Sequence, residues 1–470
     1  MFELLFTTFN YFILIYFLSL VTIYIILNLV SFKKILSYNL DVGYADLEKI
    51  FKVRNYIPIS IIVPAYNEAN GIVESVQSLL QLIYPNFQLI VVNDGSKDES
   101  IDKLVKNFEL RKTTVPPLYK LDSQQIFSVY KSIKHHNLIV VDKANGGKAD
   151  AINAGVNVAK HPLITVIDAD SILERDCLLK IVRPFLENEN ILAVGGTIRI
   201  ANGCNIRKGH VIEIGMAKSW LARFQVVEYL RAFLFGRTGF DAMNGILIIS
   251  GAFSCFRRDA LVEIGGYREG SIGEDMEIIV RMHKYFRRKN PKAKITFIPD
   301  PICWTEAPEN LKILMRQRTR WQKGTVDSVL LHKYLFMNFR YGLMGTIAFP
   351  YYVLFETFGP VIEIIGYIVF IISIVMGIVS YEFMIAFLSV AVLYGIVLSI
   401  LSVVLEELSF KKYPKIKHLF ILFSAAVLEN FGYRQLTSWW RFKGMLEYFF
   451  GKRSWGQMEK KGFSSLKPNN

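Results

Sequence analysis

Cysteine is scarce in this sequence, and its distribution excludes a disulfide framework. The 470 residues include four cysteines, Cys177, Cys204, Cys255 and Cys303. None has the CxxC or metal-ligand spacing that a structural zinc site needs. We therefore expect reduced, mostly buried thiols in a cytoplasmic domain.

Acidic residues are fewer than basic ones, 41 against 55, which gives a formal net charge of +14. Nucleic-acid binding is one explanation of such a charge, but the chain lacks a compact basic repeat with interleaved aromatic residues. Much of the basic charge lies beside apolar segments, at Lys33–Lys34, Lys411–Lys417 and Arg441–Lys461. Positive-inside flanks, and attraction to anionic lipid or to a diphosphate, explain it better. We expect a lipid bilayer as partner, and no nucleic acid.

Hydrophobic residues make up 52% of the chain and are concentrated at its two ends. The run Tyr11–Val30 is long enough to cross a bilayer, and Lys33–Lys34 follow it. A signal peptide would carry its positive charge before the apolar core. We expect an uncleaved anchor in the cytoplasmic membrane, with the N-terminus outside and Lys33 inside.

Three further apolar stretches follow, at residues 343–379, 383–405 and 418–440. The loop 406–417 carries four lysines and is expected to be cytoplasmic. This requires an odd number of crossings between Arg340 and Tyr381. Because Pro350 and Pro360 interrupt the first stretch, we expect a broken or interfacial piece plus one crossing. The last stretch either crosses or is re-entrant, and we favour the re-entrant path with a cytoplasmic tail.

Between these ends, strand-like segments alternate with helix-like ones. The expected strands are Ile59–Val63, Gln88–Val92, Leu138–Val141 and Leu163–Ile167, and the expected helices are Asn70–Leu82 and Lys148–Ala159. Such alternation predicts an α/β fold with a parallel sheet. Ligands in such folds bind beyond the carboxyl ends of the strands.

These patterns predict five parts of a multi-pass protein whose globular domain is cytoplasmic. They are an N-terminal anchor (1–32), a globular domain (55–304), amphipathic interface helices (305–340), C-terminal transmembrane helices (341–440) and a basic tail (441–470). For the amphipathic part, a helix in the membrane interface and an ordinary surface helix both fit.

The pair Asp168 and Asp170 follows an expected strand. Side chains at i and i+2 of an extended chain point to the same side, so both carboxylates can face one Mg²⁺ or Mn²⁺. Such a cation would stabilise a diphosphate leaving group. A polar strand-to-helix turn is the alternative, as it is for Asp94 in Asn93-Asp94-Gly95 and for Pro64–Glu68.

Two further motifs carry candidate chemistry. Glu274 and Asp275 follow a glycine-rich stretch and could supply a general base for a sugar hydroxyl; acids at a helix N-terminus are the alternative. The segment Gln317–Trp321 offers an arginine fork for phosphate and a flat indole for a sugar ring. An interfacial basic helix with a tryptophan anchor is the alternative there.

The order of these motifs is more specific than any one of them. The chain reads PAYNE, NDG, NGGKADAINAG, DAD, SGAF, GED and QRTRW in succession. This pattern, over roughly residues 55 to 340, resembles the processive, membrane-integrated family 2 glycosyltransferases, which include cellulose, chitin, hyaluronan and poly-N-acetylglucosamine synthases. The resemblance implies a GT-A fold, a mixed Rossmann-like sheet, beside an α-helical transmembrane region. Asn93 departs from the family's usual Asp-Asp-Gly.

The resemblance also implies roles for individual residues. The catalytic base would be Asp275, with Glu274 beside it, and Asp168 and Asp170 would handle the metal, Mg²⁺ or Mn²⁺. The nucleotide-sugar would contact Pro64, Tyr66, Glu68, Asp94, Lys148, Asp168, Gln317 and Arg320. The acceptor would contact Trp321, Ser250, Gly251 and Phe253.

The implied activity is inverting transfer of a hexose from a UDP-sugar to a growing β-linked polysaccharide, an exopolysaccharide exported across the membrane. We favour UDP-N-acetylglucosamine over UDP-glucose as donor, and accessory export proteins are further expected partners. Transfer of one sugar to a membrane lipid, and a non-catalytic scaffold or transporter, are the alternatives. Only 30 residues, 441–470, follow the last apolar segment, fewer than a domain needs, so we expect no PilZ domain.

Overall fold

The structure, a computed structural model, describes residues 2–44, 56–114, 117–119, 121–413 and 415–451. Their contacts divide the chain into two compact units, and each is treated by itself. The first, here called the sheet unit, consists of Asn39–Ala217 and Ile246–Ala307. The second, here called the helical unit, consists of Met1–Tyr38, Lys218–Gly245 and Pro308–Gln457.

Ten of the described strands form one mixed sheet in the order β3-β4-β5-β2-β1-β6-β11-β8-β12-β7. The strands are β1 (Ile59–Ala65), β2 (Phe87–Asp94), β3 (Leu110–Thr113), β4 (Ile126–Ser132), β5 (Leu138–Lys143), β6 (Leu163–Ile167), β7 (Ile172–Leu173), β8 (Ile191–Ile200), β11 (Phe253–Arg257) and β12 (Lys294–Thr305). A separate hairpin pairs β9 (Asn205–Arg207) with β10 (His210–Glu213).

The centre of the sheet is parallel, because β1 pairs in parallel with both β2 and β6, and β2 with β5. These strands are almost fully buried, which accounts for their continuous apolar sequences. Strand β11 runs antiparallel to both β6 and β8 and makes the sheet mixed.

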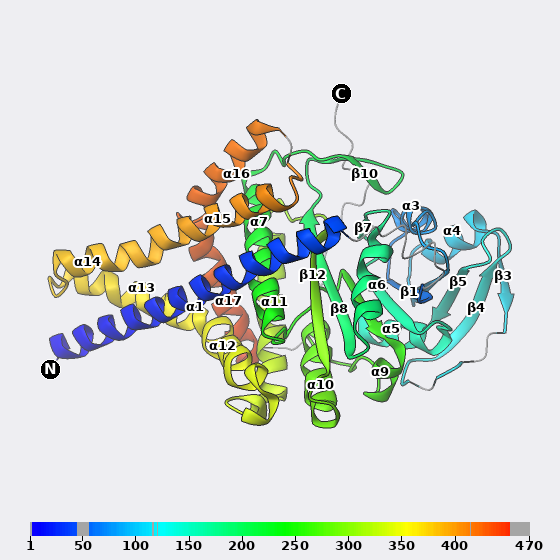
Figure 1. Cartoon of the computed structure of the whole chain (residues 1–470), viewed down its shortest axis with the longest axis horizontal. Helices are drawn as coiled ribbons and strands as arrows, with labels where there is room; N and C mark the ends of the chain where they lie inside the picture. The colour runs from blue at the N-terminus through cyan, green and yellow to red at the C-terminus, as the bar shows by residue number, and fades with distance from the viewer. Residues whose placement is uncertain (1, 45–55, 115–116, 120, 414, 452–470) are drawn as a thin grey trace. The chain divides into compact units, whose positions relative to one another are not determined.

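Helices pack against this sheet in the sheet unit. They are α3 (Ile72–Leu79), α4 (Ser100–Asn107), α5 (Lys148–Val158), α6 (Cys177–Glu187), α9 (Arg258–Glu263) and α10 (Glu274–Lys289). Helix α5 lies against β1 and β2, and α6 lies against β8 and β12 (Figure 1). Helix α5 therefore begins at the edge of the sheet where the parallel strands end.

The helical unit consists of helices from three separate parts of the chain. They are α1 (Phe2–Tyr44), α7 (Trp220–Leu230), η1 (Arg231–Arg237), α8 (Thr238–Ala242), α11 (Leu311–Leu331), η2 (Lys333–Leu335), η3 (Phe339–Tyr341), η4 (Met344–Ala348), α12 (Phe349–Tyr351), η5 (Tyr352–Thr357), α13 (Gly359–Val375), α14 (Tyr381–Leu388), η6 (Ser389–Leu393), α15 (Tyr394–Ser409), α16 (Ile416–Leu428) and α17 (Tyr433–Phe450). Helices α1, α13 and α14 run side by side (Figure 1), joined by a core of Ile13, Phe17, Phe370 and Phe387.

Within the described residues, one helical segment, Phe6–Leu40, has the length and apolar character needed to cross a membrane. A second qualifies if Met344–Thr357 and Gly359–Val375, which bend by 45° at their junction, are one span. The bend agrees with the expected broken piece in this stretch. The segment 418–440 is likewise broken, between α16 and α17.

The four strands expected from the sequence are all present, and Leu163–Ile167 has the expected bounds. The prediction of an α/β fold with a mixed sheet is confirmed: the central strands are parallel, as the alternation of strands and helices predicts, and β11 is antiparallel. The domain boundary also differs, because Lys218–Gly245 clusters with the helical unit rather than with 55–304. The four cysteines are buried thiols, as expected. Of the expected tail 441–470, residues 452–470 lie outside the described residues.

Candidate active site

The carboxyl ends of the parallel strands gather the candidate polar residues, as expected. Strand β2 ends at Asp94 and β5 at Lys143, while Asp168 directly follows β6. In the paired register, Asp94 lies opposite Lys143. Helix α5 begins beside them with Lys148, so one edge of the sheet carries both acidic and basic groups.

Lys148 is the centre of this cluster. Its Nζ lies 2.6 Å from Asp168 Oδ1 and 3.7 Å from Glu274 Oε1, and it donates to the Gly251 carbonyl at 3.4 Å. Burial alone would lower the pKa of Lys148, but Asp168 and Glu274 outweigh this effect and the net pKa is raised. Lys148 is therefore a fixed positive charge between the two acidic motifs.

Asp168 and Asp170 lie in a turn, and the expectation of an extended Asp-Ala-Asp segment is wrong in this respect. Strand β6 ends at Ile167, and the Ser171 amide donates to the Asp168 carbonyl at 3.0 Å. Both aspartates are half-buried on either side of the buried Ala169. The turn, rather than strand alternation, therefore sets the placement of the two carboxylates.

Two carboxylates fit a divalent cation that takes its remaining ligands from elsewhere. Among the described residues, no group of three or more histidine, cysteine, aspartate or glutamate side chains could hold a metal by itself. Mg²⁺ is commonly held by one or two carboxylates together with substrate phosphates and water. The donor set Asp168 and Asp170 therefore suits a metal that arrives with a diphosphate.

Glu274 and Asp275 begin helix α10, after Gly273. Glu274 is 8% exposed and Asp275 is half-buried. A β-carbon placed on Gly251 would lie 3.0 Å from Lys148 Nζ and 3.7 Å from Asp275 Oδ2. The structure thus brings together Lys148, Asp168, Gly251, Glu274 and Asp275, which come from four separate sequence motifs.

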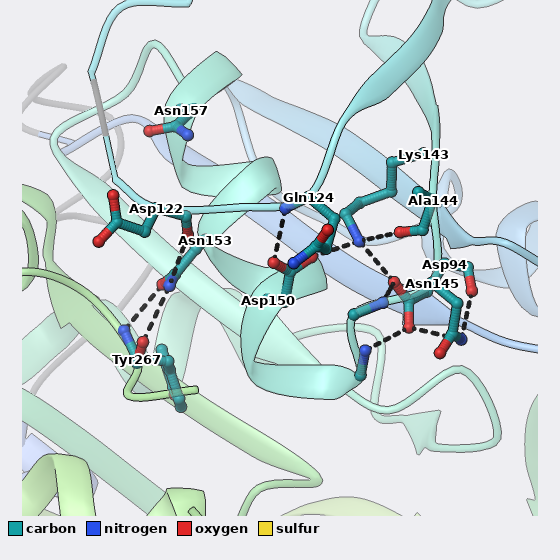
Figure 2. A network of polar contacts seen from close by, with 12 residues as sticks. Asp94, Asp122, Gln124, Lys143, Ala144, Asn145, Asp150, Asn153, Asn157 and Tyr267 are labelled. Carbon is teal, nitrogen blue, oxygen red and sulfur yellow. Dashed lines mark hydrogen bonds and ion pairs between the residues drawn. The ribbon is translucent and has the colours of Figure 1, made fainter. Parts of the chain in front are cut away.

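Asp94 is buried, and both oxygens of its carboxylate bond to groups of the protein (Figure 2). It pairs with Lys143 Nζ at 2.6 Å and accepts from the amides of Gly146 and Gly147 at 3.0 and 2.8 Å. Lys143 also pairs with Asp150, and both of these side chains are fully buried. Asp94 therefore holds the loop that precedes Lys148, and its expected contact with the nucleotide stays a prediction.

Replacing Asp94 with asparagine is expected to destabilise the protein by about 3 kcal/mol, because Lys143 loses one of its two buried counter-ions. The measurement is the thermal unfolding midpoint of the full chain in detergent. Asp122→Asn is the matched control, since Asp122 lies in the same network but is exposed; we expect a change within about 0.5 kcal/mol. Equal midpoints for the two variants would contradict this role of Asp94.

The other residues that are expected to contact the nucleotide-sugar lie in the loop after β1. Tyr66 is 40% exposed, and Pro64 and Glu68 are half-buried. The loop is tied to the end of β2, because the Asn67 amide donates to Ser96 Oγ at 3.0 Å and Asn67 Oδ1 accepts from the Lys97 amide at 2.8 Å. These ties give the loop a defined conformation at the same edge of the sheet.

The expected acceptor residues separate into two groups. Ser250 and Gly251 lie in the loop before β11, and the Gly251 carbonyl accepts from Lys148. Phe253, by contrast, is fully buried in β11. Its side chain belongs to the sheet core, so a direct contact between Phe253 and an acceptor does not fit the structure.

The motif Gln317–Trp321 lies on α11, in the helical unit. Trp321 is 41% exposed, and the guanidinium of Arg318 lies 4.4 Å from its ring centroid. Arg318 in turn donates to Glu228 at 2.8 Å. Gln317 and Arg320 are half-buried. The roles expected for Gln317, Arg320 and Trp321 stay predictions.

Sequence reasoning assigned no role to the residues of the polar network in Figure 2, which include Lys143, Asp150, Asn153 and Tyr267. The sequence does contain a pattern that indicates this network. Asp150, Asn153 and Asn157 have the spacing i, i+3 and i+7, which places polar groups on one face of a short helix. On a helix rich in alanine, isoleucine and valine, such a face points to specific partners.

Comparison with known proteins agrees with this geometry. A family model described as glycosyltransferase like family 2 matches residues 57–324, which is more than half of the chain. The chain belongs to glycosyltransferase family 2. A model described as chitin synthase matches residues 270–462. The predicted family is confirmed, and the mixed sheet agrees with the predicted fold class.

Relatives of this family 2 chain include a poly-beta-1,6-N-acetyl-D-glucosamine synthase of Staphylococcus epidermidis, 26% identical over 58% of this chain and 55% of the relative. The synthase of the same description from Staphylococcus aureus strain MSSA476 is 27% identical over 63% of this chain and 60% of the relative. The match thus spans little more than half the length of these relatives.

Solved structures similar to this family 2 chain include a mannosyltransferase from Pyrobaculum calidifontis in complex with GDP-Man and Mn²⁺. It is 17% identical, and the match covers 88% of this chain and 99% of that one, with a TM-score of 0.49.

Proposed function

We propose that this protein transfers a sugar from a UDP-sugar to the end of a growing β-linked polysaccharide. The observation that carries the proposal is the cluster around Lys148, which brings the aspartates that follow β6 together with the acids that begin α10. A glycosyl transfer needs groups for the leaving diphosphate and for the attacking hydroxyl in one place. This cluster supplies both kinds of group.

In the proposed reaction, Asp275 takes the proton of an acceptor hydroxyl as its oxygen attacks the anomeric carbon. The bond from that carbon to the diphosphate oxygen breaks, and UDP leaves with the bonding electrons. A single displacement inverts the anomeric centre, so an α-linked donor gives a β-linked product. Lys148 would place positive charge beside the leaving diphosphate.

We propose Asp168 and Asp170 as the ligands of a Mg²⁺ or Mn²⁺ ion. When bound, such a cation neutralises the charge that develops on the departing diphosphate. The carboxylate of Asp168 is already held by Lys148 at 2.6 Å, and this contact keeps it at the edge of the sheet where a diphosphate would bind.

For the donor we propose UDP-N-acetylglucosamine rather than UDP-glucose. The resemblance to synthases described as making poly-beta-1,6-N-acetyl-D-glucosamine supports this choice. The acetamido group is the only difference between the two donors, so the choice depends on a donor screen rather than on the shared uridine and phosphate contacts.

We further propose a multi-pass protein of the cytoplasmic membrane, with the sheet unit in the cytoplasm and export coupled to synthesis. The long apolar segment Phe6–Leu40 supports an anchor. Within the helical unit, Arg231 pairs with Glu429, and Arg441 Nη2 lies 2.9 Å from Glu356 Oε2. Ionisable groups in apolar helices usually pair or face a polar path, which supports a polar interior for a sugar chain.

The test is a donor screen with purified full chain in lipid nanodiscs, using radiolabelled UDP-N-acetylglucosamine and UDP-glucose with Mg²⁺ or Mn²⁺. We expect a high-molecular-weight product from the first donor, sensitive to a linkage-specific glycosidase. A product that is only mono-glycosylated lipid would overturn the polymer. UDP binding without transfer from any donor would favour the non-catalytic alternative, and Asp275→Asn serves as the inactive reference.

A further inference from the structure

One face of α5 buries three polar side chains, Asp150, Asn153 and Asn157, with exposed fractions of 0%, 1% and 5%. Buried amides and carboxylates are costly unless they find partners. Each of the three does so in a segment outside α5. Asp150 accepts from the Gln124 amide at 2.7 Å, and Asn153 bonds to Tyr267 (Figure 2). Asn157 bonds to the backbone of Leu121. This face therefore connects α5 to the surrounding loops.

Asn153 makes a reciprocal pair with the backbone of Tyr267. Its Nδ2 donates to the Tyr267 carbonyl at 2.8 Å, and its Oδ1 accepts from the Tyr267 amide at 2.8 Å. Figure 2 shows the two bonds side by side. One side chain thus satisfies both backbone groups of Tyr267 and fixes the position of this residue relative to α5.

The segment beside Tyr267 is in turn held by α10, the helix that begins with the proposed base. Arg281 donates to the carbonyls of Ile264 and Gly266 at 2.7 and 2.6 Å. The same guanidinium makes two bonds to Glu277 on α10, at 2.8 and 3.0 Å. The segment 264–267 therefore joins α5 to the first turns of α10.

The Tyr267 side chain is buried within electrostatic range of Glu274 and Asp275. Tyr267 is 4% exposed and bonds to Ser254 on β11. Burial, and then the charges of Glu274 and Asp275, raise the pKa of its hydroxyl. A tyrosine in this place stays protonated, and its backbone is anchored to α5 by Asn153.

We propose that Asn153 is a positioning residue for Asp275. By holding Tyr267, it fixes the segment 264–267, and through Arg281 this segment sets the start of α10 relative to Lys148 on α5. Asn153 touches neither donor nor acceptor in this proposal. The inference rests on the proposed function, because it takes Asp275 as the base.

Asn157 offers a matched control on the same helix face. It makes the same reciprocal pair with the backbone of Leu121, with both bonds at 2.9 Å. Asn153→Ala and Asn157→Ala each remove one such pair, and Asn153→Ala also removes a longer bond to the Asp122 carbonyl at 3.2 Å. We therefore expect losses of thermal stability of similar size, slightly larger for Asn153→Ala. Only Asn153→Ala is expected to lower kcat, by about 10- to 100-fold, as a misplaced reacting group does, while KM for the donor stays unchanged.

A second pair of variants alters the contact between Asn153 and the segment 264–267 by substitutions in that segment. A β-carbon on Gly266 would lie 2.5 Å from Asn153 Oδ1, whereas one on Gly265 would meet nothing within 4 Å. Both glycines have positive φ, +69° and +83°, so alanine strains the backbone in both variants. We expect Gly266→Ala, and not Gly265→Ala, to reproduce the loss of kcat. The two glycine variants also test the positioning role of Asn153 if Asn153→Ala fails to fold.

Hydrogen exchange of the full chain in nanodiscs tests whether Asn153 holds the segment 264–267, and this measurement does not depend on enzyme activity. Amides of residues 264–276 are expected to exchange faster in Asn153→Ala than in Asn157→Ala. Equal exchange, or equal kcat in the two asparagine variants, would overturn the inference. If the wild type transfers no sugar from any donor, the proposed function fails, and the exchange result alone still decides whether Asn153 holds this segment.

Discussion

Asparagine in place of Asp275 is expected to abolish sugar transfer while leaving UDP binding largely intact. The substitution keeps the size of the side chain but removes its ability to take a proton. General-base catalysis contributes about 10²- to 10⁴-fold, and we expect kcat to fall by that factor. The measurement is transfer of radiolabelled sugar, with UDP affinity determined in parallel by calorimetry.

A matched control separates the base from the ordinary effect of an acid at a helix start. Asp259 lies in the first turn of α9 and is exposed. It accepts from the next backbone amide at 2.9 Å, as Asp275 does at 3.0 Å. Asp259→Asn should therefore lose the same local stabilisation and keep turnover. Unchanged turnover in Asp275→Asn would remove this residue from the base role.

Loss of either Asp168 or Asp170 is expected to abolish the metal dependence of UDP binding. Even substitutions that act behind the ligands of a metal commonly weaken its binding about 10- to 100-fold, so loss of a direct carboxylate ligand should cost at least as much. The measurement is UDP affinity with Mn²⁺ and after chelation with EDTA. We expect Asp170→Asn to bind UDP equally weakly in both conditions.

Asp176→Asn is the control for this pair, because Asp176 precedes α6 and pairs with Lys180 on the same helix. It should keep the full response to Mn²⁺. Asp168→Asn has a second expected effect, since Lys148 loses its nearest counter-ion. If wild-type affinity for UDP does not respond to chelation, the proposed metal site is wrong.

The central strands were predictable because their environment is simple. Segments such as Ile59–Val63 and Leu163–Ile167 are apolar apart from one buried hydroxyl residue each, as is typical of strands buried on both faces. The polar residues that end them then fall at one edge of the sheet by topology alone. The positions of Asp94 and Asp168 followed from this rule without any knowledge of tertiary contacts.

Other features depend on contacts between distant segments and could not be read from local patterns. Strand β11 is antiparallel because of its pairing with β6 and β8. The segment Lys218–Gly245 belongs with the helices, although it lies between two parts of the sheet unit in sequence. Asn153 carries no local sign of its partner, because Tyr267 is 114 residues away.

The individual motifs were ambiguous for a physical reason. A turn that uses acids for local hydrogen bonds and a site that uses them for a ligand have the same composition. Asp94 illustrates this, since its carboxylate is occupied by Lys143 and by loop amides. Asp168 differs, because it faces Lys148 at the edge of the sheet and remains half-buried.

We expect substitutions at Asp94, Lys143 and Asp150 to occur together in evolution. Breaking a buried ion pair by neutralising one partner costs about 3–5 kcal/mol, whereas replacing the whole set with well-packed apolar side chains is often nearly neutral. Here the amides of Gly146 and Gly147 also depend on the Asp94 carboxylate, so even an apolar set would leave them without an acceptor. Descendants of this chain should therefore inherit the three residues as a single unit, with few viable intermediates between keeping all of them and rebuilding the loop before Lys148.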